Sequence, residues 1–197
     1  MAVDDTALAS SLVALLVGAD VPFATGAEGV RARLADVLSA AADVLGVDGV
    51  GLMMLGDDDE LRVVGATDDA AAALETAQRR SQVGPGIDCV RFGRTVTVDD
   101  LSRAAEYAVV WQRVRDAPGR SSGSGAEVGA VISAPVRIRG DTVGTLNALH
   151  HAPWRWHASQ VRAIEAYAAV IAILLRLEAR SLSDGGPRAQ PGPPEER

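Results

Sequence analysis

The sequence contains no lysine, one cysteine and one asparagine, and only 4% of its 197 residues are aromatic. A Schiff-base enzyme and a P-loop nucleotide-binding protein each need a lysine amine, so both classes are excluded. Cys89 has no second cysteine with which to form an intramolecular disulfide, which favours a reducing compartment. The 19 basic residues are all arginines, and with 26 acidic residues the formal net charge is −7. An acidic chain offers no positive surface for nucleic acid or an anionic membrane, so neither is expected as a partner.

Long hydrophobic runs are also missing. The two longest, Ser11–Val17 and Ala166–Leu175, are much shorter than the ~20 apolar residues that a membrane-spanning helix needs. The amino terminus reads Met-Ala-Val-Asp-Asp, which is acidic where a secretory signal is basic. We therefore expect a cytoplasmic protein. Because 48% of the residues are apolar, the chain can bury a core of its own.

Hydrophobic periodicity divides the chain into three parts: a helix and linker at 1–28, a folded domain at 29–183, and a disordered tail rich in proline and glycine at 184–197. Segment 83–93 is predicted to be a loop with one short helical turn, and 118–125 a mobile loop. The remaining patterns predict helices at 4–17, 30–45, 68–80, 106–115 and 156–183, and strands at 47–55, 60–67, 95–98, 129–138 and 142–151. This order of elements is typical of an α+β fold with an antiparallel sheet.

The clearest local signal is a hairpin at 128–151, where two β-prone runs flank a tight turn. If Gly140-Asp141 is the two-residue turn, the register follows directly, because side chains alternate between the two sheet faces. One face then carries three cross-strand pairs: Val136 with Thr145, Ala134 with Asn147, and Ile132 with Leu149.

The run Glu127–Asn147 (EVGAVISAPVRIRGDTVGTLN) resembles the hairpin of GAF domains, in which a G-x-x-S-x-x-x-x-P-L strand is followed by G-x-x-x-G-x-L-N. Val83–Gly93 and Val98-Asp99-Asp100-Leu101 resemble the family's G-x-G-x-x-x-x-x-x-x-G and V-x-D-L stretches. The resemblance covers Gly29 to Leu182. It is closest to the GAF domains that precede an RNA-binding antiterminator (ANTAR) module in high-GC bacteria, although no such module is expected in the short tail.

The resemblance implies a GAF-like sheet with helices on one face and a roof over a ligand pocket on the other. The candidate ligand-binding residues are Asn147, Thr145, Ile132 and Ala134 on the sheet, and Trp111, Tyr107 and Cys89 in the roof segments. Each has an alternative interpretation: Asn147 can support the fold by bonding a loop backbone, Thr145 can reflect β propensity, and Trp111 can belong to the core. The sequence does not identify the ligand or any cofactor.

No catalytic or metal-binding set is predicted. Cys89 lies beside Asp88 with no nearby histidine or lysine, so its thiol is not activated. Some GAF domains reduce free methionine sulfoxide, but that chemistry needs a nucleophilic and a resolving cysteine, and bilin attachment needs a cysteine–histidine neighbourhood. His150 and His151 are strand neighbours, expected to point to opposite faces and unable to chelate one ion. The acidic run at 57–60 lacks the spacing of a calcium loop.

The apolar pattern of the last helix predicts a second copy of the chain as its partner. Within Ala158–Leu182 there are two apolar faces, whereas a helix on one sheet face needs only one. We expect it to form a homodimer together with the amphipathic helix Asp4–Val17, as a symmetric bundle. Alternatively, Asp4–Val17 folds back onto its own last helix. The function predicted is a small-molecule-responsive sensory module acting through this bundle; the alternative is a ligand-free module that binds another regulator.

Overall fold

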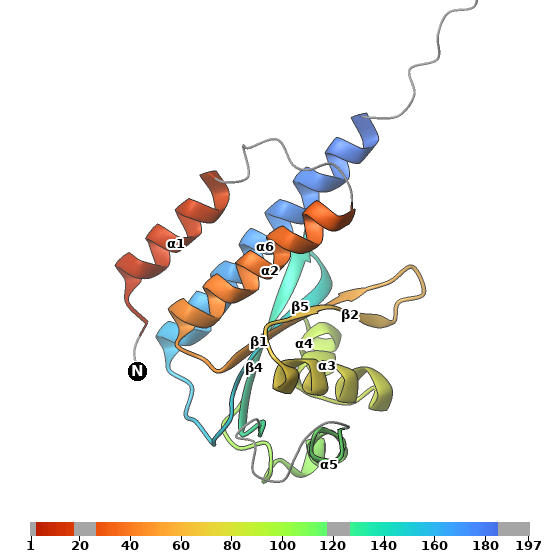
Figure 1. Ribbon diagram of the computed structural model, residues 1–197. Coiled ribbons are helices and arrows are strands. Elements are labelled where there is room, and N and C mark those ends of the chain that lie inside the picture. Colours follow the sequence, from red (N-terminus) through yellow and green to blue (C-terminus); the bar gives the residue numbers. More distant parts are fainter. Residues whose placement is uncertain (1–2, 18–26, 118–126, 185–197) are drawn as a thin grey trace, which may run out of the picture.

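The sheet of the computed structural model, which describes residues 3–17, 27–117 and 127–184, has five antiparallel strands in the order β2-β1-β5-β4-β3 (Figure 1). The predicted α+β fold is therefore confirmed. The strands are β1 (Gly49–Leu55), β2 (Leu61–Ala66), β3 (Val96–Val98), β4 (Ala130–Ile138) and β5 (Asp141–His150). The predicted loop at 118–125 and the tail beyond Asp184 lie outside the described residues, as does most of the predicted linker.

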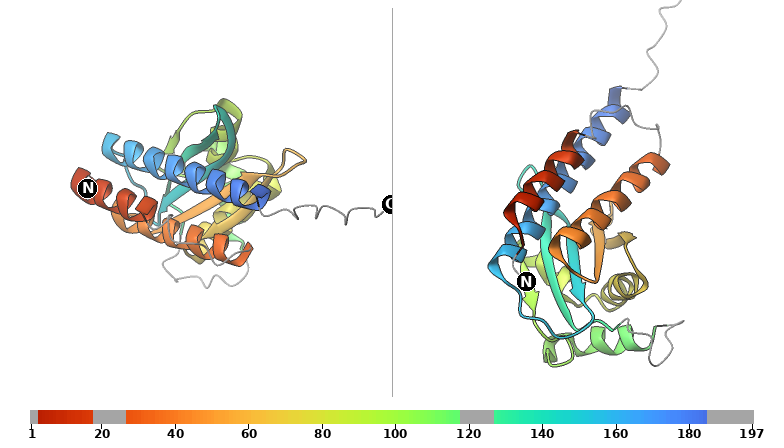
Figure 2. Two further views of the ribbon diagram at one scale, coloured as in Figure 1. Left: turned by 90° about the horizontal axis from the view of Figure 1, so that it is seen from above. Right: turned by 60° about the vertical axis from the view of Figure 1, so that its left-hand side comes forward.

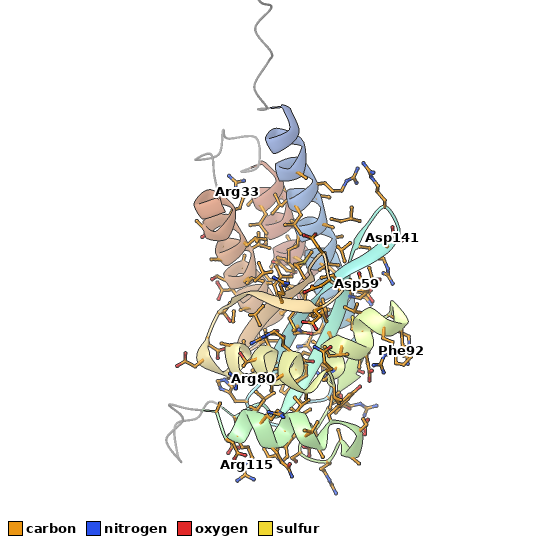
Figure 3. The ribbon with its side chains drawn as sticks, turned by 90° about the vertical axis from the view of Figure 1, so that its right-hand side faces the viewer. Arg33, Asp59, Arg80, Phe92, Arg115 and Asp141 are labelled. Carbon is orange, nitrogen blue, oxygen red and sulfur yellow. The ribbon has the colours of Figure 1, made fainter. Side chains whose placement is uncertain are left out.

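The helices form two layers, one on each face of the sheet (Figures 1 and 2). One layer contains α1 (Asp5–Val17), α2 (Ala27–Leu45) and α6 (Ala158–Asp184). The other contains α3 (Asp69–Ser81), α4 (Pro85–Phe92), the 3₁₀ turn η2 (Ala105–Tyr107) and α5 (Ala108–Arg115). We call the sheet face under this second layer the roof face. Figure 3 draws the side chains of the described residues and labels Arg80 of α3, Phe92 of α4 and Arg115 of α5 in this second layer.

Helix α4 corrects the prediction of a loop with one helical turn at 83–93. The segment forms an eight-residue helix, and its glycines and proline mark the ends. Pro85 occupies the first turn, where its missing N–H costs nothing, and Gly93 ends the helix in the left-handed region at φ 60°. The glycines and the proline on either side of the apolar residues therefore mark the two ends of a helix, although the same pattern predicted one irregular loop.

The hairpin register is one residue away from the prediction. The turn is Arg139-Gly140, with positive φ at both residues, and a bulge follows between Val136 and Arg137. A two-residue turn that matches strand twist requires positive φ at both positions, which Gly140 meets at no steric cost. The resulting cross-strand pairs are Ser133 with Asn147, Pro135 with Thr145, Ala134 with Leu146, and Ile132 with Ala148.

This shift moves two predicted ligand residues to the wrong side of the sheet. Ile132 and Ala134 are fully buried in the core cluster that the sheet forms with α2 and α6. A register slip of one residue exchanges the faces of a strand. Ile132 and Ala134 are therefore core residues, and Ser133 takes their expected place on the roof face.

Helix α1 packs on α2 and α6 of its own chain (Figure 2). The Tyr167 hydroxyl donates to Ser11 Oγ at 2.7 Å, and Val3 N donates to Ser159 Oγ at 3.2 Å. These contacts favour the alternative in which α1 folds back, and the dimer stays a prediction. In the described part of the chain, one stretch, Ala158–Leu177, is long and apolar enough to cross a membrane, but half of it is buried in the structure.

Candidate ligand site on the roof face

Asn147 and Thr145 project from β5 onto the roof face, where both are buried. The Asn147 amide Nδ2 donates to both carboxyl oxygens of Glu75 on α3, at 2.9 Å each. The Thr145 hydroxyl donates to Asn147 Oδ1 at 3.2 Å. Asn147 therefore bonds a side chain of the opposite layer, and not a loop backbone as the alternative interpretation supposed.

Gln78, one helical turn after Glu75, joins α3 to the start of α4. Its Oε1 accepts a hydrogen bond from Gly86 N at 2.7 Å, and its Nε2 donates to Glu75 Oε2 at 3.0 Å. A backbone N–H can only donate, so Gly86 fixes which end of the Gln78 amide faces Glu75. The side chain thus satisfies a free N–H in the first turn of α4 while it supplies a donor to the buried carboxyl.

Glycines make the space that these polar groups occupy. A Cβ on Gly51 of β1 would lie 2.1 Å from Glu75 Oε1, and a Cβ on Gly86 would lie 2.9 Å from Asn147 Oδ1. Neither position tolerates a side chain without displacing the group above it. We call Glu75, Gln78, Asn147 and Thr145 the polar cluster.

Glu75 is fully buried, and burial raises its pKa to about 8 against the opposing effect of the hydrogen bonds from Asn147 and Gln78. No cation of the described residues contributes to that balance. At neutral pH the carboxyl therefore holds a proton. A strongly shifted acid at the centre of a buried face is a candidate functional group.

Cys89 and Tyr107 extend the site along α4 and η2. The Cys89 thiol is hydrogen-bonded to the side chain of Thr145, and burial raises its pKa to about 11. The Tyr107 hydroxyl donates to Asp88 Oδ2 at 2.8 Å, and desolvation together with this carboxylate raises the Tyr107 pKa. The thiol is thus protonated at neutral pH and is not a nucleophile.

Trp111 lies apart from the polar cluster. It is half-buried against the apolar cluster that α3 and α5 form over the sheet, and the Arg115 guanidinium lies 5.4 Å from its ring centroid. The structure thus brings Asn147, Thr145 and Cys89 into contact. Tyr107 bonds Asp88, the residue that precedes Cys89, and Trp111 does not reach this group.

Sequence reasoning missed Glu75, Gln78 and Ser133. Ser133 lies directly opposite Asn147, is fully buried, and its Oγ has no hydrogen-bond partner among the described residues. A signal for the first two was available: Glu75 and Gln78 share the buried face of α3 with Ala71 and Leu74, so two polar residues interrupt an apolar stripe. Ser133 could not be found because its face depends on the bulge between Val136 and Arg137, which no local pattern in the sequence marks.

The histidine prediction is wrong in one respect. His150 Nδ1 and His151 Nδ1 both face Asp48 Oδ2, at 3.3 and 4.0 Å, because β5 ends at His150 and the chain bends at His151. Partial burial alone would raise the pKa of Asp48, but hydrogen bonds from His151 N and the His150 ring hold it below its usual value. Within the described ranges, no group of three or more His, Cys, Asp or Glu residues is placed to hold a metal ion.

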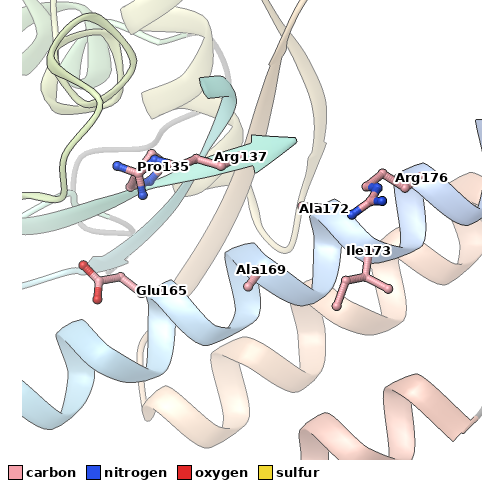
Figure 4. A pocket seen from close by; sticks show the side chains of 7 residues that line it. All are labelled: Pro135, Arg137, Glu165, Ala169, Ala172, Ile173 and Arg176. Carbon is pink, nitrogen blue, oxygen red and sulfur yellow. The ribbon is translucent and has the colours of Figure 1, made fainter. Parts of the chain in front are cut away.

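A groove of about 430 Å³ lies between β4 and α6 (Figure 4). The Arg137 guanidinium donates to the carbonyl of Gly93, and the Thr95 hydroxyl donates to Glu165 Oε1 at 2.5 Å. The groove is lined by Pro135, Arg137, Glu165, Ala169, Ala172, Ile173 and Arg176. None of the predicted ligand residues lines this groove.

Comparison with known proteins supports the resemblance. The GAF domain family model matches residues 30–175, and none of the curated proteins compared matches the chain. The fold is similar to the GAF domain of an Acinetobacter phosphoenolpyruvate-protein phosphotransferase (TM-score 0.64, 12% identity, 93% of this chain and 98% of that one). It is also similar to a free methionine-R-sulfoxide reductase from Neisseria meningitidis solved with its substrate (TM-score 0.62, 14% identity, 90% and 95%). A third similar structure is a domain assigned to a two-component sensor histidine kinase of Sinorhizobium meliloti (TM-score 0.61, 13% identity, 83% and 100%).

Proposed function

The chain belongs to the GAF domain family, whose members are sensory and regulatory signalling modules, and from this premise we propose that it is a small-molecule-responsive regulator. Its ligand site is the roof face around Asn147, Thr145, Cys89 and Tyr107, extended by Glu75, Gln78 and Ser133. The proposal includes a cytoplasmic location and no direct contact with nucleic acid or membrane, in keeping with the acidic net charge.

The observation that carries this proposal is the Glu75–Asn147 pair. A carboxyl group with an exposed fraction of 0% costs several kcal/mol to bury in its charged form, and an apolar side chain would serve the core better. The cluster also includes the one asparagine of the sequence, on the strand at the centre of the sheet. A costly polar group is best explained by a function that uses it.

The site has a direct route to the helical layer. Thr145 and Asn147 face the roof, while Leu146 and Ala148, their neighbours on β5, pack into the core with α2 and α6. A ligand that rearranges the polar cluster therefore acts on a strand whose other face supports the output helices. Its effect is limited to its difference in affinity for the two arrangements.

A thermal-shift screen of nucleotides and metabolites tests the proposal. We expect at least one compound to raise the melting temperature in a saturable way, because a ligand that binds only the folded state stabilises it. Asn147→Ala is expected to abolish the rise, whereas Thr97→Ala, an exposed change on β3, leaves it intact. A panel without any response, or a response that survives Asn147→Ala, contradicts the site.

A second candidate function is a ligand-free interaction module. The observation in its favour is that Asn147 and Glu75 satisfy each other without a ligand. In that case the roof face is structural and the exposed apolar residues of the helical layer, Val13, Ile173 and Leu177, carry the function. A silent metabolite panel together with capture of a regulator by this layer favours the second function.

The homodimer through α1 and α6 is part of the proposal. With α1 folded back, Val13 is 58% exposed and Ile173 41%, which leaves an apolar surface for a second copy. We expect a dimer in size-exclusion chromatography with light scattering at micromolar concentration. Val13→Asp and Ile173→Asp should each raise the dissociation constant about tenfold or more, and Val64→Asp, exposed on β2, should not. A wild-type monomer at this concentration contradicts the dimer.

We also propose that the chain is not a methionine sulfoxide reductase, although the fold is shared with such enzymes. The sequence has one cysteine, and the Cys89 thiol is buried with a pKa raised to about 11 by desolvation. A reductive thiol needs the opposite environment, one that favours the thiolate. A sensory role explains the site without requiring this thiol to react.

A further inference from the structure

We propose that the ligand of the roof face carries a cationic group with several N–H donors, such as an amidine, a guanidine or a primary amine, and that this group pairs with the carboxyl of Glu75. The inference rests on the proposed function and names the chemical class of its ligand. It follows from what the polar cluster offers and from what it lacks.

Glu75 offers acceptors and lacks a counter-charge. Its two oxygens receive only neutral amide donors, from Asn147 and Gln78. A carboxylate accepts about four hydrogen bonds, so at least one acceptor site is unused. Within the described ranges no arginine or histidine forms an ion pair with it. A planar cation with two N–H groups supplies both the charge and the matching bidentate geometry.

Gln78 occupies the place of such a donor in this structure. Its Nε2 lies 3.0 Å from Glu75 Oε2, and its side chain is packed beside Gly84 and Gly86, where a Cβ would lie 2.4 Å and 3.1 Å from its Oε1. The contact is made by a neutral side-chain amide with three rotatable bonds. A ligand cation in this place exchanges a neutral donor for a charged one, and the Gln78 amide then has to turn away from Glu75 about its hydrogen bond with Gly86 N.

Ser133 is a second group without a hydrogen-bond partner among the described residues. Its Oγ is buried without a hydrogen-bond partner, and it lies opposite Asn147 on the adjacent strand. An unsatisfied buried hydroxyl costs about 1–3 kcal/mol. Both groups adjoin Asn147 on the roof face, so a ligand that pairs with Glu75 can direct a second N–H to the Ser133 hydroxyl.

Binding of a cation has a proton balance that can be measured. Free Glu75 is protonated at neutral pH because burial raises its pKa to about 8, and pairing with a cation ionises it, so one proton passes to solvent for each ligand bound. Three other titratable groups lie around the cluster. Burial raises the pKa values of Cys89, to about 11, and of Tyr107. Asp88 accepts the hydrogen bond of Tyr107. The proton is therefore assigned to Glu75.

The test uses matched aromatic probes and calorimetry on the full chain. Benzamidine, phenylguanidine and benzylamine should raise the melting temperature of the wild type, and benzamide and benzoate should not. At pH 7, titrations in two buffers of different ionisation enthalpy should show release of close to one proton. The affinity should rise by up to about tenfold per pH unit toward pH 8 and level off above it.

Two variants make the result specific. Glu75→Gln, which keeps the shape of the protonated acid, should abolish the response to the cationic probes and the proton release, and Ser133→Ala should weaken binding several-fold. Asp36→Asn, at an exposed carboxylate on α2 in the opposite layer, is the matched control and should change neither. The inference is overturned if ligands that depend on Asn147 bind Glu75→Gln as well as wild type. A panel silent to every compound overturns the proposed function itself.

Discussion

Glu75→Gln is expected to remove a loss of stability that wild type shows as the pH rises. The pKa of Glu75 lies near 4.5, the ordinary value of a glutamate, when the chain is unfolded, and burial raises it to about 8 in the folded state. Between these values the folded state binds a proton that the unfolded state does not, so the free energy of unfolding falls as pH increases. At about 1.36 kcal/mol per pKa unit, the fall amounts to a few kcal/mol. Below pH 4.5 both states are protonated and the difference disappears.

Glutamine reproduces the protonated acid, with one accepting oxygen and one donating end, and it does not ionise. Wild type and Glu75→Gln should therefore have similar stability at pH 5, and the variant should be more stable by a few kcal/mol at pH 9. Urea unfolding followed by tryptophan fluorescence at pH 5, 7 and 9 measures the difference, with Glu165→Gln as the exposed control. Parallel pH profiles for wild type and Glu75→Gln would show that the buried carboxyl does not hold the proton.

The layers of the fold could be predicted because they depend on local patterns. Leu61–Ala66 and Val96–Val98 each contain two valines at close spacing, which favours strands, and α2 and α6 present apolar stripes at helical spacing. These signals do not need to know which element packs against which. The end of α6 and the start of α3 also agree with the predicted ranges to within two residues.

The prediction of the site depended on the register of the β4–β5 hairpin, which local sequence patterns determine poorly. Asn147 and Thr145 were found because they interrupt an otherwise apolar sheet face, but their partners across the hairpin depended on the turn and on the bulge beside it. Moving the turn from Gly140-Asp141 to Arg139-Gly140 shifts the pairing by two residues and would by itself leave Ala134 on the roof face. The bulge between Val136 and Arg137 shifts it back by one residue, and this exchanges Ala134 for Ser133. A register error of one residue costs nothing in local propensity and changes every cross-strand pair.

The contact between Glu75 of α3 and Asn147 of β5 could not be predicted from the sequence for a different reason. Glu75 and Asn147 are 72 positions apart, and their pairing is visible only when α3 lies over β5. A glutamate in an Ala-rich helix is ordinarily exposed, so composition argued against burial. The matching clue is on a third element, because Gly51 of β1 is small where Glu75 needs room. Likewise, the apolar faces of α1 and α6 required a cover without saying whether it came from the same chain.

Gly51→Ala is expected to destabilise the fold by about 3 kcal/mol or more. The new Cβ would lie 2.1 Å from Glu75 Oε1 and 2.8 Å from its Cδ and Cγ. Strand β1 cannot move away, because Gly51 is paired on both sides, with Ala66 of β2 and Asn147 of β5. Glu75 must move, and overpacking then adds to the cost of leaving two buried amides without their acceptor.

Gly65→Ala on β2 is the matched control, since its Cβ would meet only the end of the Leu38 side chain, at 3.1 Å. It should cost about 1 kcal/mol or less, because one flexible methyl group can shift. A double-mutant cycle then identifies the cause of the Gly51→Ala effect. In a Glu75→Ala background the clashing atoms are gone, so Gly51→Ala should cost little, and the coupling free energy between the two positions should exceed about 2 kcal/mol. Equal costs in both backgrounds would mean that the Gly51→Ala cost comes from strand β1 alone, and that Gly51 is not small in order to make room for Glu75.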